Sequence, residues 1–149
     1  DAKIKLDFVL RDEDADIALL KSPLPLKPLP YAWGDSSKIK TGDAVYLVGN
    51  AFNLGLNVRS GIISAEAGPP IMTRYGILPE RTFMINTGVF RGDSAGPVFA
   101  FRNGRPEIIG LAQAMLSLAP NFGYVLRSEF ILKTIKPYYD PKNIEELIN

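Results

Sequence analysis

The start of the chain alternates between apolar and polar side chains. In KIKLDFVLRD, residues 3–12, one face carries Ile4, Leu6, Phe8 and Leu10. A period of two predicts a strand with one buried face. The short apolar run DIALLK, residues 16–21, predicts a second strand that is buried. The first part of the chain is therefore expected to consist of strands.

A proline-rich stretch follows, SPLPLKPLPYAWGDSS at residues 22–37. Proline has no N–H for a sheet ladder, so this stretch is predicted to be an extended connector or a sheet edge. Its Pro-x-x-Pro spacing would also suit a ligand for an SH3-type domain. Composition favours the first interpretation, a surface connector whose leucines cover a core.

The remaining strands are separated by turn residues. They are predicted at residues 42–50, 57–68, 82–86, 96–101, 106–115 and 122–126, with a loop at 69–81. Asn103-Gly104 predicts the turn of a β-hairpin. Ser128 is expected to cap a helix over 129–136, and Asp140-Pro141 to start a second short helix. About eight short strands followed by helices favour an all-β barrel or sandwich.

Composition removes several classes of function. The 149 residues are 46% hydrophobic and 22% charged, and the net charge is +1. No basic stripe suggests nucleic acid or an anionic membrane as a partner. The chain has no Cys and no His, which excludes disulfides and the usual cysteine or imidazole metal sites. No cofactor is expected, and DAKIKLDFVL does not have the pattern of a signal peptide.

The sequence FRGDSAGPVF, residues 90–99, carries the candidate chemistry. Glycines at positions 92 and 96 flank Ser94 and permit a tight turn. In such a turn, the main-chain N–H groups of Gly92 and Ser94 could form an oxyanion hole. Small-residue turns are common, however, so the motif alone leaves a purely structural turn open.

Two other interpretations of this motif are weaker. Gly-x-Ser-x-Gly also occurs at the nucleophile elbow of α/β-hydrolases, but that elbow leads from a strand into a helix, whereas GPVFAF is strand-like. An α/β-hydrolase would also need a histidine after Ser94, and none is present. The Arg-Gly-Asp tripeptide at 91–93 could suggest integrin binding, but the same residues fit the serine turn.

Five ordered segments resemble the trypsin-like serine proteases, specifically the HtrA (Deg) branch. They are DADIALLK, WGDSSKIKTGDAVYLVGN, AFNLGLNVRSGIISA, RGDSAGPVF and EIIGLAQAM with FGYVL, and the similarity covers roughly residues 1 to 136. The resemblance implies a chymotrypsin-like double β-barrel with a C-terminal helix. It implies Ser94 as nucleophile and Asp16 as triad acid, whereas Asp12, Glu13 and Asp14 nearby fit solvated charges.

The resemblance also divides the chain. Residues 1–52 are expected to be the remainder of an N-terminal β-barrel, 53–127 a C-terminal β-barrel, and 128–149 a helical tail. The few strands in the first 50 residues cannot close a six-stranded barrel. A missing N-terminal segment or another chain is therefore expected to complete it.

The family's third catalytic residue is a histidine that precedes the aspartate. Only fifteen residues precede Asp16, and none of them is histidine. The simplest expectation is that the sequence begins after that histidine, and that these 149 residues alone hydrolyse essentially nothing.

By the same resemblance, substrate preference depends on Gly88 and Val89, and on the pocket walls at Ala112, Gln113, Ala114 and Gly123. No carboxylate stands at position 88 or 89, so cleavage after small-to-medium apolar residues is expected rather than after Lys or Arg. Two residues depart from the HtrA pattern. Asp93 replaces the usual Asn and Ala95 the usual Gly. In trypsin-like enzymes this Asp pairs with a newly cut Ile or Val N-terminus, and Asp1 is neither.

The sequence therefore favours a serine endopeptidase that acts on polypeptides through an acyl-enzyme. The alternative is a non-catalytic, protease-like binding or scaffold module. The resemblance further implies a location outside the cytoplasm and a possible homo-oligomer.

Overall fold

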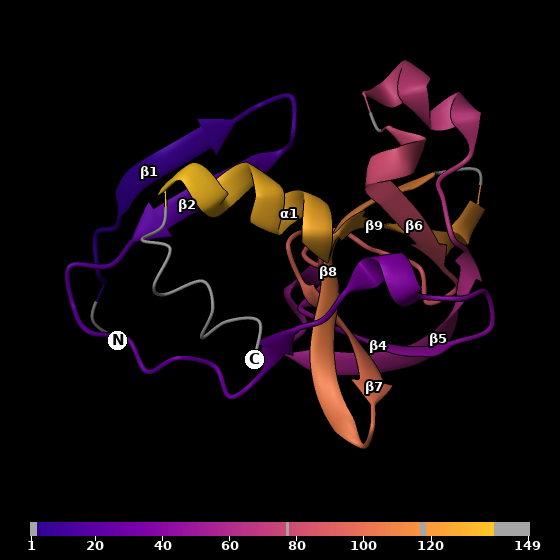
Figure 1. Cartoon of the computed structure of the whole chain (residues 1–149), viewed down its shortest axis with the longest axis horizontal. Helices are drawn as coiled ribbons and strands as arrows, with labels where there is room; N and C mark the ends of the chain where they lie inside the picture. Colours follow the sequence, from indigo (N-terminus) through magenta and orange to yellow (C-terminus); the bar gives the residue numbers. More distant parts are fainter. Residues whose placement is uncertain (1–2, 77, 117–118, 139–149) are drawn as a thin grey trace.

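The computed structural model describes residues 3–76, 78–116 and 119–138. Figure 1 shows a two-stranded hairpin and a helix on one side of the molecule, and a closed barrel on the other. The hairpin is formed by β1 (Asp7–Asp12) and β2 (Ile17–Lys21), and the helix is α1 (Ser128–Ile135). The expected all-β class is confirmed.

Six antiparallel strands close the barrel. They are β4 (Ala44–Gly49), β5 (Asn57–Ala65), β6 (Thr82–Ile85), β7 (Pro97–Arg102), β8 (Arg105–Leu116) and β9 (Ala119–Arg127). Their order is β8-β7-β4-β5-β6-β9, and pairing of β9 with β8 completes the ring. The short strand β3 (Ala32–Trp33) adds to β8 in parallel.

Alternating apolar residues fill the barrel interior. Val45 and Leu47 in β4 are fully buried, with Ile63 from β5 and Val98 from β7 in the same cluster. The predicted hairpin joins β7 to β8. Asn103 and Gly104 both have positive φ, at 51° and 74°, as a tight hairpin turn requires.

One strand lies in a different place from the one expected. The sequence predicts an N-terminal barrel over residues 1–52, which includes residues 44–49. In the structure β4 pairs with β5 on one side and β7 on the other, so it belongs to the closed barrel. The reason is that the apolar residues of β4 face the core of that barrel. In the described chain, β4 forms backbone ladders with β5 and β7 only.

The β1–β2 hairpin is more exposed than its sequence predicts. Phe8 is 71% exposed, and β2, expected to be buried, alternates between half-buried and exposed residues. A register shift between Phe8 and Leu10 also breaks the predicted alternation. The reason is that the described chain supplies only two strands to this sheet. Its half-buried face packs in one cluster with α1, including Leu10, Ile17, Leu19, Leu126 and Ile131.

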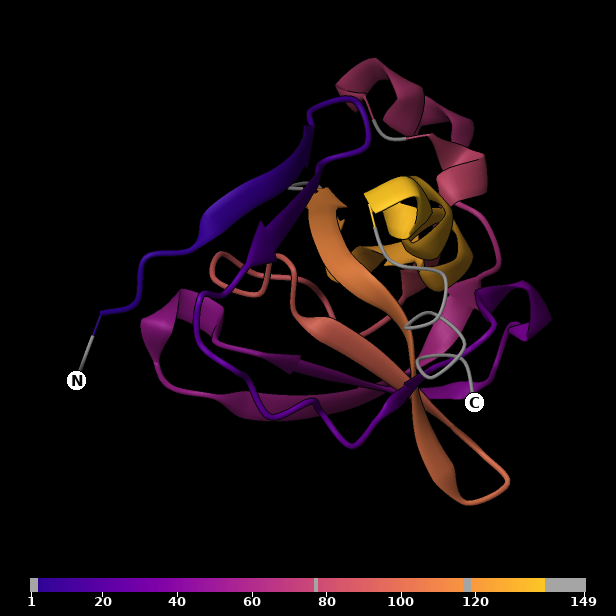
Figure 2. The same cartoon turned by 60° about the vertical axis from the view of Figure 1, so that its left-hand side comes forward.

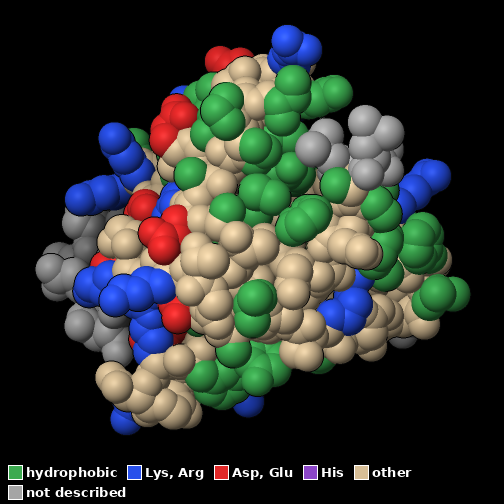
Figure 3. Space-filling model, turned by 90° about the vertical axis from the view of Figure 1, so that its right-hand side faces the viewer, with side chains coloured by type: hydrophobic (Ala, Val, Ile, Leu, Met, Phe, Trp, Pro, Cys, Tyr) green, Lys and Arg blue, Asp and Glu red, His purple; other side chains and the backbone are tan. Residues whose placement is uncertain are grey.

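Short helical turns occupy the connections. They are η1 (Ser36–Lys38), η2 (Ala51–Asn53), η3 (Pro70–Tyr75), η4 (Pro79–Arg81) and η5 (Lys136–Tyr138). Residues 69–81, expected to be a loop, therefore contain two of them. The segment lies at the top of Figure 1, and Figure 3 shows hydrophobic side chains on the surface near the top of the molecule. Ile71 and Tyr75 of this segment are exposed. Figure 2 shows α1 nearly end-on between that segment and the hairpin.

The expected cap of α1 is wrong. Ser128 is already the first helical residue, and Arg127 precedes it without a side-chain cap. The Ser128 hydroxyl instead donates a 2.6 Å hydrogen bond to the Gly34 carbonyl and accepts one from the Ser36 amide. This buried contact fixes the start of α1 to the chain around β3.

The second expected helix, at residues 140–147, lies outside the described residues. No helix in the described part is long and apolar enough to cross a membrane.

Candidate active site

Ser94 lies on a tight turn between β6 and β7, and its side chain is exposed. Two hydrogen bonds shape the turn. The Asp93 amide donates to the Phe90 carbonyl at 2.9 Å, and the Gly96 amide donates to the Asp93 carbonyl at 2.7 Å. Local backbone bonding therefore presents the serine hydroxyl to solvent rather than to the core.

Strand β8 anchors the far side of this turn. The Ala95 amide donates to the Ala112 carbonyl, and the Ala112 amide donates to the Gly96 carbonyl, both at 2.8 Å. Ala95 adopts a left-handed φ of 64°. That conformation costs an L-residue roughly 1–2 kcal/mol relative to the right-handed region, which explains why glycine suits this position better.

A neighbouring turn fixes the peptide between Arg91 and Gly92. The Phe52 amide in η2 donates to the Arg91 carbonyl at 2.7 Å. Because a trans peptide points its C=O and N–H in opposite directions, the Gly92 N–H faces away from η2. Glycine is required at 92, where φ is 99° and a Cβ would stand 2.3 Å from the Asn50 carbonyl oxygen.

The two candidate oxyanion donors are the amides of Gly92 and Ser94. In the described part of the chain, neither donates to another protein group. Unpaired N–H groups on a turn held in this way are suited to bind an oxygen that carries developing negative charge.

Asp16 lies at the end of the turn between β1 and β2, and its side chain is exposed. Gln113 of β8 donates from Nε2 to its Oδ2 at 3.4 Å. Two neighbouring acidic residues, Asp12 and Glu13, make local contacts instead. Asp12 accepts a 2.9 Å hydrogen bond from the Ala15 amide, and Glu13 pairs with Arg11 at 3.1 Å.

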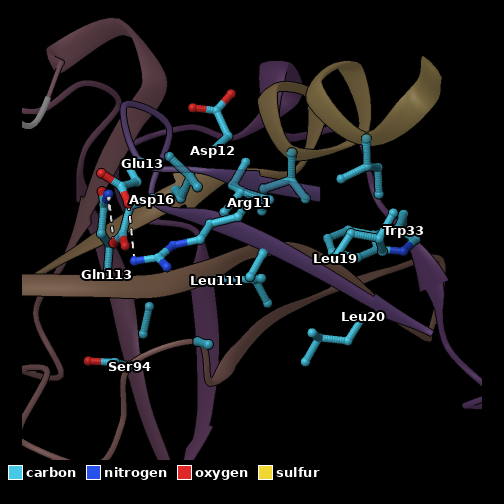
Figure 4. A pocket seen from close by; sticks show the side chains of 17 residues that line it. Arg11, Asp12, Glu13, Asp16, Leu19, Leu20, Trp33, Ser94, Leu111 and Gln113 are labelled. Carbon is cyan, nitrogen blue, oxygen red and sulfur yellow. Dashed lines mark hydrogen bonds and ion pairs between the residues drawn. The ribbon is translucent and has the colours of Figure 1, made fainter. Parts of the chain in front are cut away.

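One hollow brings these groups together. Ser94 and Asp16 both line it, and so do Ala112 and Gln113. Figure 4 shows Ser94 on one side and, across from it, Asp16 and Gln113 joined by their hydrogen bond. The rest of the wall is largely apolar, from Leu19, Trp33, Leu111, Leu126, Ile131 and Ile135. The wall of this hollow thus carries both a hydroxyl and a carboxylate.

The other predicted substrate-binding residues lie outside this hollow. Val89 is 3% exposed and belongs to the barrel core. Gly88 is buried, and its amide donates to the Asn121 carbonyl at 3.1 Å. Gly123 packs so closely that a Cβ would stand 2.5 Å from Val89 Cγ2. Ala114 packs instead against the cluster of Met72 and Tyr124.

Asp93 is fully buried beneath the turn. Its carboxylate is therefore out of reach of an integrin-type partner, which removes the Arg-Gly-Asp interpretation. One carboxylate oxygen accepts a 2.8 Å hydrogen bond from the Phe90 amide and lies 2.5 Å from a guanidinium nitrogen of Arg59.

Sequence reasoning did not identify Arg59 or the part played by η2. Asp93 is the residue that could have pointed to Arg59, because a buried carboxylate needs a cation nearby. Arg59 lies on the same inward-facing side of β5 as Ile63. In η2, Phe52 and Asn53 have left-handed φ values of 54° and 58°. Asn is a residue type that tolerates this conformation, but Phe is not, so the sequence AFNLGLN does not predict the strain at Phe52.

Comparisons with known proteins identify the family. Residues 2–111 match the family described as Trypsin-like peptidase domain. A probable periplasmic serine endoprotease DegP-like of Brucella suis biovar 1 (strain 1330) is 40% identical over 108 residues, which are 71% of this chain and 20% of that protein. The periplasmic pH-dependent serine endoprotease DegQ of Escherichia coli (strain K12) is 38% identical over 114 residues, 76% of this chain and 23% of that protein.

The fold is similar to solved structures as well. The HtrA-type protease AlgW with tripeptide superposes with a TM-score of 0.72 at 29% identity, covering 88% of this chain and 42% of that one. The chain thus spans about a fifth of the length of these curated relatives.

Proposed function

The chain belongs to the trypsin-like peptidase family, in its HtrA branch, and we propose that it is the Ser94-bearing part of a serine endopeptidase. The observation that carries the proposal is the shared hollow. An exposed serine hydroxyl and the carboxylate of Asp16 line it together, although 78 positions of sequence separate them. A turn made only for structure would not need that juxtaposition.

The proposed reaction begins with attack of Ser94 Oγ on a peptide carbonyl carbon. A neutral imidazole takes the hydroxyl proton as the new C–O bond forms. The amides of Gly92 and Ser94 hold the resulting oxyanion, and losing one such donor costs roughly 3–4 kcal/mol of barrier. The imidazolium then gives its proton to the leaving amine, and the C–N bond breaks to leave an acyl-enzyme on Ser94.

Water completes the cycle. The imidazole takes a proton from water, hydroxide adds to the acyl carbon, and the serine oxygen leaves with a proton to restore the enzyme. Asp16 would hold the imidazole in the required tautomer and stabilise its charged form. Gln113 would in turn keep the Asp16 carboxylate in place through the 3.4 Å contact. The imidazole must come from outside these 149 residues, which contain no histidine. We propose an upstream segment or another chain as its source.

A fluorophosphonate probe tests this function. We expect the natural full-length protein to be labelled at Ser94. Attack of the serine on the probe needs the same nucleophile, base and oxyanion donors as its attack on a peptide bond. The 149 residues alone should give neither labelling nor peptide hydrolysis, since they lack the base. Mass spectrometry of the labelled peptide identifies the site. An intact, folded full-length protein that the probe leaves unmodified would instead support a non-catalytic binding or scaffold module.

We further propose a preference for small-to-medium apolar side chains before the cleaved bond. Gly88 has a φ of 64°, and a Cβ there would stand 2.6 Å from the Pro120 carbonyl oxygen. The backbone at this position therefore rejects any side chain, including the carboxylate that would bind Lys or Arg. A peptide library digested by the full-length protein should show cleavage after such apolar residues. A strong preference for basic residues contradicts the proposal.

The relatives' names also suggest where the protein works. The DegP-like and DegQ proteins are called periplasmic, and we propose a location outside the cytoplasm and polypeptide substrates for this protein. Homo-oligomerisation is proposed from the resemblance to the HtrA branch alone.

A further inference from the structure

Asp93 forms a buried ion pair directly beneath the candidate nucleophile. Arg59 Nη2 lies 2.5 Å from Asp93 Oδ2, and the side chain of Arg59 is only 24% exposed. It is the only cation within ion-pair distance of Asp93 in the described part of the chain. Asp93 therefore depends on Arg59 for its counter-charge.

The carboxylate is poorly satisfied apart from this pair. Asp93 Oδ1 and the guanidinium nitrogens of Arg59 have no hydrogen-bond partner among the described residues, so the pair is held by proximity of charge. Asp93 Oδ1 also faces Gly49 so closely that a Cβ there would stand 2.2 Å away. A buried carboxylate without a counter-ion is strongly destabilising. Removing Arg59 would thus drive Asp93, and the turn that contains it, out of the present conformation.

Arg59 also holds the other end of the same turn. Its guanidinium carbon lies 5.3 Å from the centre of the Phe90 ring. The ring of Phe52, on η2, lies 5.6 Å from the Phe90 ring between their centres. The Phe90 amide donates to Asp93 at 2.8 Å. Arg59 therefore contacts both residues that close the turn through Gly92, directly before Ser94.

We propose that Arg59 is a positioning residue that holds the Ser94 turn and its oxyanion amides in the reactive arrangement. By the resemblance, an aspartate at this position is expected to pair with a newly cut N-terminus. Here a strand residue supplies the cation, so the turn is assembled without cleavage of the chain. This inference rests on the proposed endopeptidase function, but the ion pair itself can be tested separately.

The experiment compares Arg59→Gln, Asp93→Asn and the double variant in the full-length protein, with the rate of fluorophosphonate labelling and the urea unfolding midpoint as readouts. Arg59→Gln should slow labelling on the order of 10²-fold, comparable to loss of an oxyanion donor. Adding Asp93→Asn should restore labelling to within about twofold of Asp93→Asn alone, because Arg59 has no buried carboxylate to neutralise in that background and the two changes are fully coupled. Rescue is the diagnostic result, because a packing role for Arg59 would not be relieved by neutralising Asp93.

Three further measurements keep the outcome clear. Arg81→Gln removes a guanidinium that lies 4.5 Å from the Phe130 ring and does not line the shared hollow, and it should leave labelling within about twofold. Arg59→Lys keeps the charge and should retain most of the labelling, even if Arg59→Gln does not fold. Blocking the terminal α-amine with 2-pyridinecarboxaldehyde should change nothing.

Three results would overturn the inference. They are normal labelling in Arg59→Gln, a double variant as slow as Arg59→Gln, or loss of labelling when the terminal amine is blocked. If the unsubstituted protein is not labelled at all, the proposed function fails, and with it the positioning role. Coupling between Arg59 and Asp93 in the unfolding midpoints would then show a purely structural ion pair.

Discussion

Replacing Ser94 with alanine in the full-length protein is expected to lower peptide hydrolysis on the order of 10⁶-fold, the loss seen when a serine nucleophile is removed from a triad. The reason is geometric. Ser94 is exposed on a turn whose backbone is fixed by Ala112 and Phe90, so no other hydroxyl can take its place at the oxyanion amides. A continuous peptide assay over several hours measures the residual rate.

Ser37→Ala is the matched control for this change. Ser37 is another exposed serine, but it lies in η1 and its hydroxyl donates to Asp35 at 2.6 Å. Its removal should leave the rate of hydrolysis unchanged. In both variants, the KM for the substrate should stay near its original value. Residual hydrolysis in Ser94→Ala within about tenfold of the original would contradict the assignment of the nucleophile, since it corresponds to only about 1.4 kcal/mol of barrier.

The strands of the barrel could be predicted because each is a short, largely apolar segment bounded by turn residues. Val45 and Leu47 alternate with half-buried neighbours, and the Asn103-Gly104 turn follows from residue preference. The barrel to which β4 belongs could not be predicted in this way. Its partners are set by non-local pairing, such as Val45 with Ala100, and periodicity carries no information about partners.

The same distinction explains the candidate site. Ser94 stands in a local motif, so sequence alone could single it out. The contact between Gln113 and Asp16 joins residues 97 positions apart, and only the packing of the hairpin against β8 brings them together. Arg59 lies on a strand with no motif around it, and its role depends on a carboxylate buried by the fold.

Ser128 shows how tertiary contacts override a local signal. A serine before EFILKTIK is typical of an N-cap. The buried hydroxyl instead bonds the Gly34 carbonyl at 2.6 Å, because an unpaired carbonyl there would cost more than an uncapped helix end that other groups can satisfy.

Asp16→Asn is expected to give the second largest effect, a loss of about 10⁴-fold in kcat, by analogy with the same change in a serine-protease triad. Gln113 Nε2 donates to Asp16 Oδ2, so an asparagine would orient its carbonyl oxygen toward Gln113. Its NH₂ group would then face the imidazole. That group cannot accept the imidazole N–H, so it would favour the tautomer that cannot take the Ser94 proton.

Asp14→Asn provides the comparison on the same turn. Asp14 is also exposed, two residues away, and does not line the hollow that Ser94 and Asp16 share. Its substitution should change kcat by less than about twofold, as is usual for surface changes worth under 0.5 kcal/mol. Urea unfolding of both variants separates catalysis from stability, because Asp16 is exposed and its loss should leave the unfolding midpoint nearly unchanged. Equal losses in Asp14→Asn and Asp16→Asn would mean that the turn contributes only negative charge, and that no carboxylate there orients an imidazole.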